Sequence, residues 1–207
     1  MRLHFAGEIT GFGTTSGRRV VIGNWATSPF GAFADVMTES PDGVRTLLAP
    51  SDRVADFVST TYEFDRVEIV AVRVRRSGSV LECTAGPLTV ELDIGGRTPL
   101  GAALRLVPRR VATSPLWCSL VDPVAAVLLR GVRTRGSAGN GRREWYGATD
   151  QRRVDAVRAS WSGEDLGSLD HVWPPVGFGF SSVPRHPSSV RVVTTIEVGH
   201  PPGRAGR

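Results

Sequence analysis

VRTRGSAGNGRREWYGATDQRR, residues 132–153, is the passage on which an interpretation of this sequence depends. It combines six arginines with a glycine-rich centre and an adjacent pair of large aromatic residues, Trp145 and Tyr146. Three interpretations compete for such a passage: a loop that holds phosphate, an arm that binds nucleic acid, or a β-hairpin with an exposed tip. Its neighbours in the chain decide between them.

The glycines at 136, 139 and 141 have the wrong spacing for a dinucleotide-binding loop. They spell G-x-x-G-x-G, whereas the fingerprint is G-x-G-x-x-G between a strand and a helix. The residues that follow, REWYGATD, favour a strand. Arg142, Arg143 and Trp145 offer charge and a stacking surface to nucleic acid, but no RNA-binding signature accompanies them.

The hairpin interpretation fits better. VRTR and REWYGATD are predicted as paired strands, with residues 136–141 as a solvent-exposed tip that has no ligand of its own. Asn140-Gly141 favours a tight reversal of the chain. Because side chains alternate along a strand, Trp145 and Tyr146 point to opposite faces. We therefore expect one of them in the core and the other at the wall of a cavity.

Composition limits the chemistry of the chain. The 207 residues hold 25 basic side chains, every one an arginine, with a net charge of +5 and a pI of about 10.4. The arginines are scattered among acidic residues, which argues against nucleic acid as a partner. Without lysine, the chain cannot form a lysine Schiff base with a substrate or with pyridoxal phosphate, which excludes any lysine-dependent decarboxylase. It cannot form a P-loop either.

Two-residue periodicity dominates the remainder of the sequence. Its length suits one domain over residues 1–199, followed by a disordered tail at 200–207. We expect a helix in 50–62, capped by Ser51 or Asp52. Strand patterns occur at 2–12, 18–25, 30–40, 40–50 (a hairpin through Asp42-Gly43), 66–76, 79–86, 88–96, 152–161 and 189–199.

Residues 99–131 lack this alternation and predict helices divided by Pro108, Pro115 and Pro123. The near-helical spacing of four apolar residues predicts that they face the sheet: Leu116, Leu120, Val124 and Val127. The fold class is therefore mainly β (α+β). We expect an antiparallel β-barrel or strongly bent sandwich of about nine to ten strands, with a short helix and a broken helical pair covering one side.

Few residues stand out as site candidates. Asp35 lies on an otherwise apolar strand, so we expect it to be buried beside an arginine. Glu144 and Asp150 either form ordinary ion pairs with Arg142 and Arg152 or act as acid and base. The histidines lack ligand spacing, so we expect no metal and no cofactor. The candidate ligand-binding residues are Trp25, Asp35, Glu144, Trp145, Tyr146 and Asp150.

Two stretches, SPFGAFADVMTESPDGVRTLLAP (28–50) and VRTRGSAGNGRREWYGATD (132–150), resemble a conserved actinobacterial protein family of unknown function. The resemblance runs over most of the chain and implies no activity.

The leading functional hypothesis is a β-barrel-like domain that binds a small apolar or amphipathic ligand. A lysine-free enzyme with an Asp/Glu–Arg site in a cleft is the first alternative. A protein-interaction module or homodimer formed through residues 115–129 is the second. The apolar run at 115–129 is too short to span a bilayer, and the chain opens with no export signal. We therefore expect a cytoplasmic protein with free thiols at Cys83 and Cys118.

Overall fold

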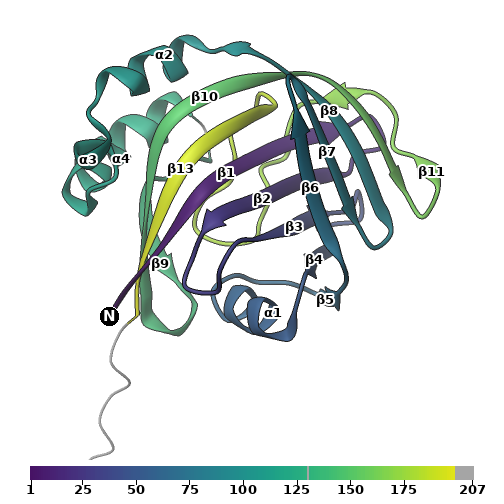
Figure 1. Cartoon of the computed structure of the whole chain (residues 1–207), viewed down its shortest axis with the longest axis horizontal. Helices are drawn as coiled ribbons and strands as arrows, with labels where there is room; N and C mark the ends of the chain where they lie inside the picture. Colours follow the sequence, from purple (N-terminus) through teal and green to yellow (C-terminus); the bar gives the residue numbers. More distant parts are fainter. Residues whose placement is uncertain (130, 199–207) are drawn as a thin grey trace, which may run out of the picture.

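The computed structural model describes residues 1–129 and 131–198. The predicted tail at 200–207 lies outside the described residues. The chain begins with an antiparallel meander, as the alternation predicts (Figure 1). Its strands are β1 (Arg2–Thr14), β2 (Arg19–Thr27), β3 (Phe33–Glu39) and β4 (Arg45–Ala49). The β3–β4 turn places Gly43 at a φ of 82°, in the left-handed region that glycine adopts without strain.

Helix α1 (Asp52–Ser59) follows the meander and begins at Ser51, whose side chain accepts a hydrogen bond from the backbone N–H of Val54. The prediction of one strand over 66–76 is wrong. The segment forms β5 (Arg66–Ile69), which pairs parallel to β4, and β6 (Val72–Ser77), which pairs antiparallel to β7. The chain leaves one edge strand at Ile69 and enters the other edge strand at Val72, which is why the ladder breaks there.

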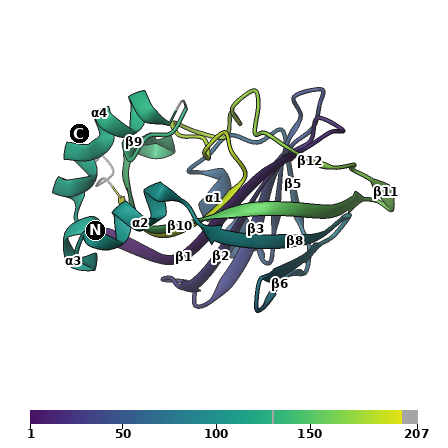
Figure 2. The same cartoon turned by 90° about the horizontal axis from the view of Figure 1, so that it is seen from above.

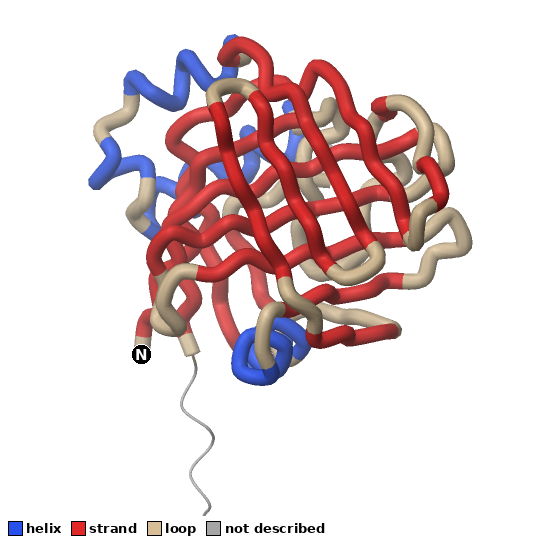
Figure 3. The backbone as a smooth tube through the Cα atoms, turned by 45° about the vertical axis from the view of Figure 1, so that its right-hand side comes forward, coloured by secondary structure: helices blue, strands red, loops and turns tan. Residues whose placement is uncertain are grey.

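A single curled sheet results, with the strand order β5-β4-β3-β2-β1-β13-β10-β8-β7-β6 (Figure 3). It is a mixed half-barrel, since β4 and β5 run parallel. β9 (Arg135–Ala138), β11 (Glu164–Asp165) and β12 (Leu169–Asp170) pair beside this path. The remaining strands are β7 (Val80–Ala85), β8 (Leu88–Arg97), β10 (Arg142–Trp161) and β13 (Ser188–Glu197).

The main apolar core lies between the meander and the returning part of the sheet. Phe12, Ile22 and Val36 from the meander pack with Leu81 of β7 and Leu92 of β8, and all five are almost fully buried. The meander therefore buries one face against β7 and β8. Its opposite face is free to border a second compartment.

The helical segment comprises α2 (Pro99–Leu106), α3 (Arg109–Ala112) and α4 (Pro115–Leu128), which gather at one end of the molecule (Figures 1 and 2). Pro108 and Pro115 separate the pieces as expected, whereas Pro123 lies inside α4 and does not divide it. Ser114 caps α4 by accepting a hydrogen bond from the N–H of Trp117.

The sequence predicts that the stripe Leu116, Leu120, Val124 and Val127 faces the sheet. The prediction is wrong for three of these residues, whereas Val124 is 56% exposed and also lines the inner side of α4. Leu116 is 82% exposed, Leu120 69% and Val127 79%. The neighbouring stripe of Trp117, Val121 and Ala125 faces inward instead. Both stripes are apolar, so helical spacing alone could not choose between them.

The predicted hairpin forms with a shifted register. β9 begins at Arg135 instead of residue 132, and Trp145 on β10 pairs with Arg135. The turn covers residues 139–141 and places Asn140 at a φ of 58°. Its residues are exposed, but the Asn140 Nδ2 group donates to the Thr60 carbonyl over 3.0 Å. The tip is thus attached to the end of α1 and does not extend freely into solvent.

Both cysteines are free and buried, Cys83 in a strand and Cys118 in α4. Among the described residues, no helix has the length and apolarity needed to cross a bilayer.

The corrected orientation of α4 has a measurable consequence. Replacing Leu120 with alanine removes little buried surface, so the free energy of unfolding should change by no more than about 0.5 kcal/mol. Leu92→Ala, in the fully buried core, should cost about 2–5 kcal/mol. Urea denaturation of both variants measures the difference. A large loss in the free energy of unfolding of Leu120→Ala would contradict the exposed position of Leu120 and support an orientation towards the sheet.

Candidate functional site: a cavity between the curled sheet and helix α4

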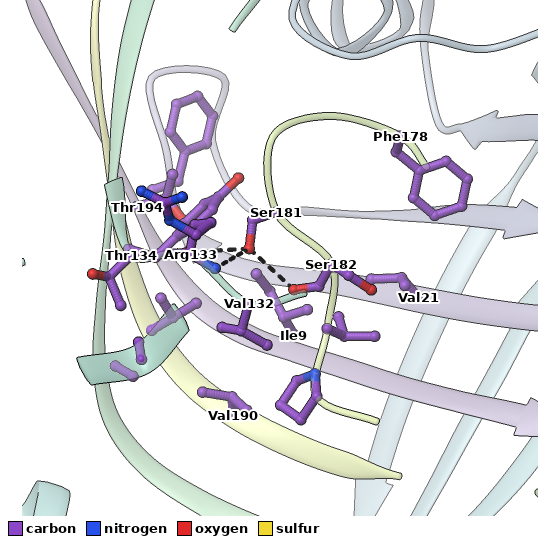
Figure 4. A pocket seen from close by; sticks show the side chains of 18 of the residues that line it. Ile9, Val21, Val132, Arg133, Thr134, Phe178, Ser181, Ser182, Val190 and Thr194 are labelled. Carbon is purple, nitrogen blue, oxygen red and sulfur yellow. Dashed lines mark hydrogen bonds between the residues drawn. The ribbon is translucent and has the colours of Figure 1, made fainter. Parts of the chain in front are cut away.

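The face of the meander opposite the main core borders a cavity of about 500 Å³. Strands β1, β2, β3, β10 and β13 form its wall, α4 covers it, and the loop through Phe178, Ser181 and Ser182 lies at its side (Figure 4). Ile9, Val21, Val190 and Thr194 are among the strand residues in this view. The lining is almost entirely apolar, as in typical small-molecule sites.

Strand alternation explains which residues reach the cavity. Val21, Gly23 and Trp25 on β2 pair with Met37, Asp35 and Phe33 on β3, and all six line the cavity. Residues between them, such as Ile22 and Val36, face the main core. Both faces of these strands are therefore buried.

Aromatic side chains gather at one part of the wall. The ring of Phe5 stacks on Phe57 with centroids 5.3 Å apart and meets the edge of Trp25 at 5.9 Å. Phe30 and Phe33 complete the cluster. Such contacts give this part of the wall a defined shape.

Asp35 is the principal ionisable group at the cavity wall. It is 1% exposed, and its Oδ1 accepts a hydrogen bond from Trp25 Nε1 over 2.9 Å. Burial raises the pKa of this carboxyl to about 7, because it penalises the charged form more than the tryptophan bond favours it. Gly23 makes the arrangement possible, since a Cβ there would lie 2.4 Å from Oδ1.

Glu144 forms a second polar group with two tyrosines. Its Oε2 lies 2.9 Å from the hydroxyl of Tyr62 and 2.9 Å from that of Tyr146, and the two hydroxyls lie 2.8 Å apart. Glu144 is fully buried, and burial raises its pKa, opposed by the tyrosine hydrogen bonds. Burial together with the charge of Glu144 also raises the pKa of both tyrosines.

Counting protons favours a neutral Glu144. The two tyrosines supply only two hydroxyl protons for three close oxygen contacts. A third proton, on Glu144 Oε2, lets each of the three groups donate once and accept once in a closed ring. Because the two tyrosines line the cavity, this ring offers uncharged hydroxyl oxygens as acceptors beside it, and a tyrosine donates to a ligand only when it gives up its hydrogen bond within the ring.

The chain segment after α4 fixes the side of the cavity. Arg133 binds Asp122 on α4 through two guanidinium nitrogens, and this ion pair lowers the pKa of Asp122. The backbone N–H of Arg133 donates to Ser181 Oγ over 2.9 Å, and Ser181 Oγ donates to the Arg133 carbonyl over 3.1 Å (Figure 4). The loop and α4 are thus joined through one arginine.

The structure brings together some of the candidate residues. Trp25, Asp35 and Tyr146 line the cavity, and Glu144 is hydrogen-bonded to the hydroxyl of Tyr146. Neither acid forms a hydrogen bond with an arginine: Asp35 bonds to Trp25, and Glu144 bonds to tyrosines. The charge of Arg142, the expected partner of Glu144, does act to lower the pKa of that carboxyl. Tyr62 belongs to the group, yet no sequence signal identified it, since 82 residues separate it from Glu144.

The other two candidates lie away from the cavity. Trp145 is buried on the opposite face of β10, where its Nε1 donates to Ser119 Oγ over 3.2 Å. Asp150 forms a two-pronged ion pair with Arg97 at 2.8 and 3.1 Å, which lowers the pKa of Asp150. Within residues 1–129 and 131–198, no group of three or more His, Cys, Asp or Glu side chains is arranged to hold a metal ion.

Comparisons with known proteins add a fold-level likeness. No protein-family model matches the sequence, and a search of curated proteins finds no related sequence. An acetoacetate decarboxylase from Legionella pneumophila matches 94% of this chain and 84% of its own, with 9% identity and a TM-score of 0.40. A second acetoacetate decarboxylase matches 97% of this chain and 90% of its own, with 10% identity and a TM-score of 0.44.

These values concern the fold, and no activity is carried over from them. Catalysis through a lysine Schiff base remains excluded, because the chain holds no lysine. The resemblance to an actinobacterial family stays a prediction.

The raised pKa of Asp35 predicts a pH-dependent stability. Because the folded state binds this proton more tightly than the unfolded chain, stability falls as pH rises from 3.8, the usual pKa of an aspartate, to about 7. Asp35→Asn keeps an acceptor for Trp25 but lacks the titration. Its stability relative to the wild type should therefore increase over this range, by about 4 kcal/mol at most. Urea denaturation at pH 4 and pH 8 measures the change.

Asp122→Asn is the matched control, because the pKa of Asp122 is lowered and not raised. Its carboxylate stabilises the fold at neutral pH, and that contribution disappears on acidification. The control should therefore show the opposite dependence on pH. A pH-independent difference between Asp35→Asn and the wild type would contradict burial of a titrating Asp35.

Proposed function

We propose that this protein binds a small amphipathic molecule in the cavity beneath α4, with the apolar part of the molecule against the sheet. The observation that carries the proposal is the cavity itself: about 500 Å³, almost wholly apolar in lining, with Asp35 and two tyrosines at its wall. Cavities of this size and character enclose most of the surface of a ligand of small-molecule dimensions.

The polar groups favour a neutral head group on the ligand. A hydroxyl or carbonyl can exchange hydrogen bonds with Tyr62, Tyr146 or Asp35. An anionic head would be disfavoured in this apolar cavity, because burial of a charge without an opposite charge beside it is costly. Arg133, the arginine at the cavity wall, is already engaged by Asp122.

Filling part of the cavity should weaken binding. Ala125 faces the cavity from α4, so Ala125→Phe should weaken binding of the neutral apolar dye N-phenyl-1-naphthylamine at least tenfold, about 1.4 kcal/mol. Val127→Phe adds the same aromatic group to the exposed side of the same helix and should leave binding unchanged. Fluorescence titration measures both. Wild-type protein that binds no dye, or equal binding by both variants, would refute the proposal.

A second candidate function is proton transfer on a bound substrate. The observation that favours it is the pKa of about 7 at Asp35, which suits a general base near neutral pH. Asp35 would remove a proton next to a carbonyl while a tyrosine hydroxyl donates to the carbonyl oxygen. This replaces the Asp/Glu–Arg pair expected from the sequence with an aspartate and a tyrosine.

Proton transfer can be tested without a known substrate. In D₂O, the wild type should accelerate deuterium incorporation beside the carbonyl of 2-octanone, measured by NMR. The rate should rise with pH towards a plateau above about 7, and Asp35→Asn should lose at least about 100-fold of the acceleration. Asp150→Asn, outside the cavity, should retain it. Dye binding without any exchange would leave ligand binding as the function.

A further inference from the structure

The helical end of the molecule exposes large apolar side chains to solvent. Leu106 at the end of α2 is 84% exposed, and Leu116, Leu120 and Val127 on α4 are all more than two-thirds exposed. α2, α3 and α4 gather at this end, away from β6 and β11 (Figures 1 and 2). Soluble surfaces seldom concentrate large apolar residues in this way without a binding role.

The exposed charges of the same segment are all positive. Residues 99–128 contain three arginines, Arg105, Arg109 and Arg110, all exposed, and no described salt bridge involves them. Asp122 is the sole acidic residue of this range, and it is buried in its ion pair with Arg133. The helical end therefore combines exposed apolar side chains with exposed arginines that form no described salt bridge.

We propose that α2, α3 and α4 form a docking surface for an anionic lipid bilayer. Helices that lie in a membrane interface insert apolar side chains between the lipids and place arginines near the head groups. Each arginine close to an anionic surface strengthens partitioning about fivefold. The charge of the segment thus matches the surface that its apolar residues would enter.

The position of α4 links this surface to the cavity. Val124 lines the cavity and is also 56% exposed, so it stands between the inward and outward stripes of the helix. A bilayer against the outward stripe would lie next to the cavity and could supply an amphipathic ligand. This supply role rests on the proposed function, whereas the docking does not.

A second copy of the chain fits the surface less well. In a two-fold symmetric dimer, the same surface patch contacts itself. Each copy would bring Arg105, Arg109 and Arg110 to an interface whose helices expose no carboxylate, and like charges across an interface suppress association. The charge pattern thus favours an anionic lipid surface over the homodimer expected through residues 115–129.

Vesicle co-sedimentation tests the proposal. The wild type should bind vesicles of equal parts phosphatidylglycerol and phosphatidylcholine at least tenfold more tightly than pure phosphatidylcholine vesicles, and 0.5 M NaCl should weaken the binding. Arg105→Gln/Arg109→Gln/Arg110→Gln should lose at least tenfold in affinity. Leu116→Gln/Leu120→Gln should lose a similar factor, because the apolar contacts disappear.

The matched control removes the same charge elsewhere. Arg66→Gln/Arg73→Gln/Arg75→Gln changes exposed arginines on β5 and β6, and should keep most of the affinity. Equal losses in both arginine variants would overturn the proposal, as would wild-type protein that ignores anionic vesicles. A concentration-dependent dimer in sedimentation equilibrium that Leu116→Gln/Leu120→Gln abolishes, without vesicle binding, would assign the surface to a second copy.

Docking and ligand binding fail separately in this design. Ala125→Phe fills the cavity but leaves the exposed stripe intact, so it should still bind anionic vesicles while losing the dye. A wild-type protein that binds anionic vesicles but not the dye would refute the proposed function and leave the docking proposal standing.

Discussion

The fold depends on one long strand, β10, which changes its main pairing partner along its length. β10 pairs with β13 over Arg143–Arg153 and with β8 over Arg152–Trp161. Register shifts fall between Ala148 and Asp150 and again on either side of Val154, where the strand bends. Bulges of this kind increase local twist and redirect a strand. The bend carries β8, β7 and β6 back over the meander and so creates the main core.

The same bend leaves the other face of the meander without a sheet to cover it. That face is apolar at Phe5, Ile9 and Val21, so another element must shield it from water. α4 covers it at a distance that leaves a cavity. The two edge strands, β5 and β6, are joined by Val70 and Ala71 but do not pair with each other, so the curled sheet does not close its ladder. A half-barrel with one covered, incompletely filled face is the outcome.

Local signals in the sequence predicted much of this architecture. Alternation located the meander, and Ser51 marked a helix start, because caps and period-two patterns act over a few residues. Local sequence patterns did not predict the features that depend on contacts between residues far apart in the sequence. The two alternating halves of 66–76 are joined by the continuous apolar run 69–72, which does not by itself distinguish a corner from a buried strand. The two apolar stripes of α4 differ only in which one meets the cavity.

In the candidate site too, local sequence predicted the burial of one residue but not the partners that come from elsewhere in the chain. Burial of Asp35 followed from a single acid on an apolar strand. Its partner could not be predicted, because Trp25 reaches it across a strand pair whose register depends on the β2–β3 turn. Tyr62 lies at the end of a helix with no local signal of its role. Tyr62 contacts Glu144 because the start of β10 lies beside the residues that follow α1.

Two buried carboxyls beside an apolar cavity constrain what that cavity can hold. An isolated buried charge is costly, and an arginine partner is the usual remedy. Here Asp35 has an indole and Glu144 has two phenols, which stabilise a carboxylate less than an arginine would. Raised pKa values follow directly, and the carboxyls approach neutrality instead of pairing. Valine or phenylalanine at these positions would complete an apolar wall at lower cost. The retained groups instead confine hydrogen-bonding capacity to a few points on an otherwise apolar wall. In the proposed function, these points are what would orient a ligand whose other contacts are non-directional.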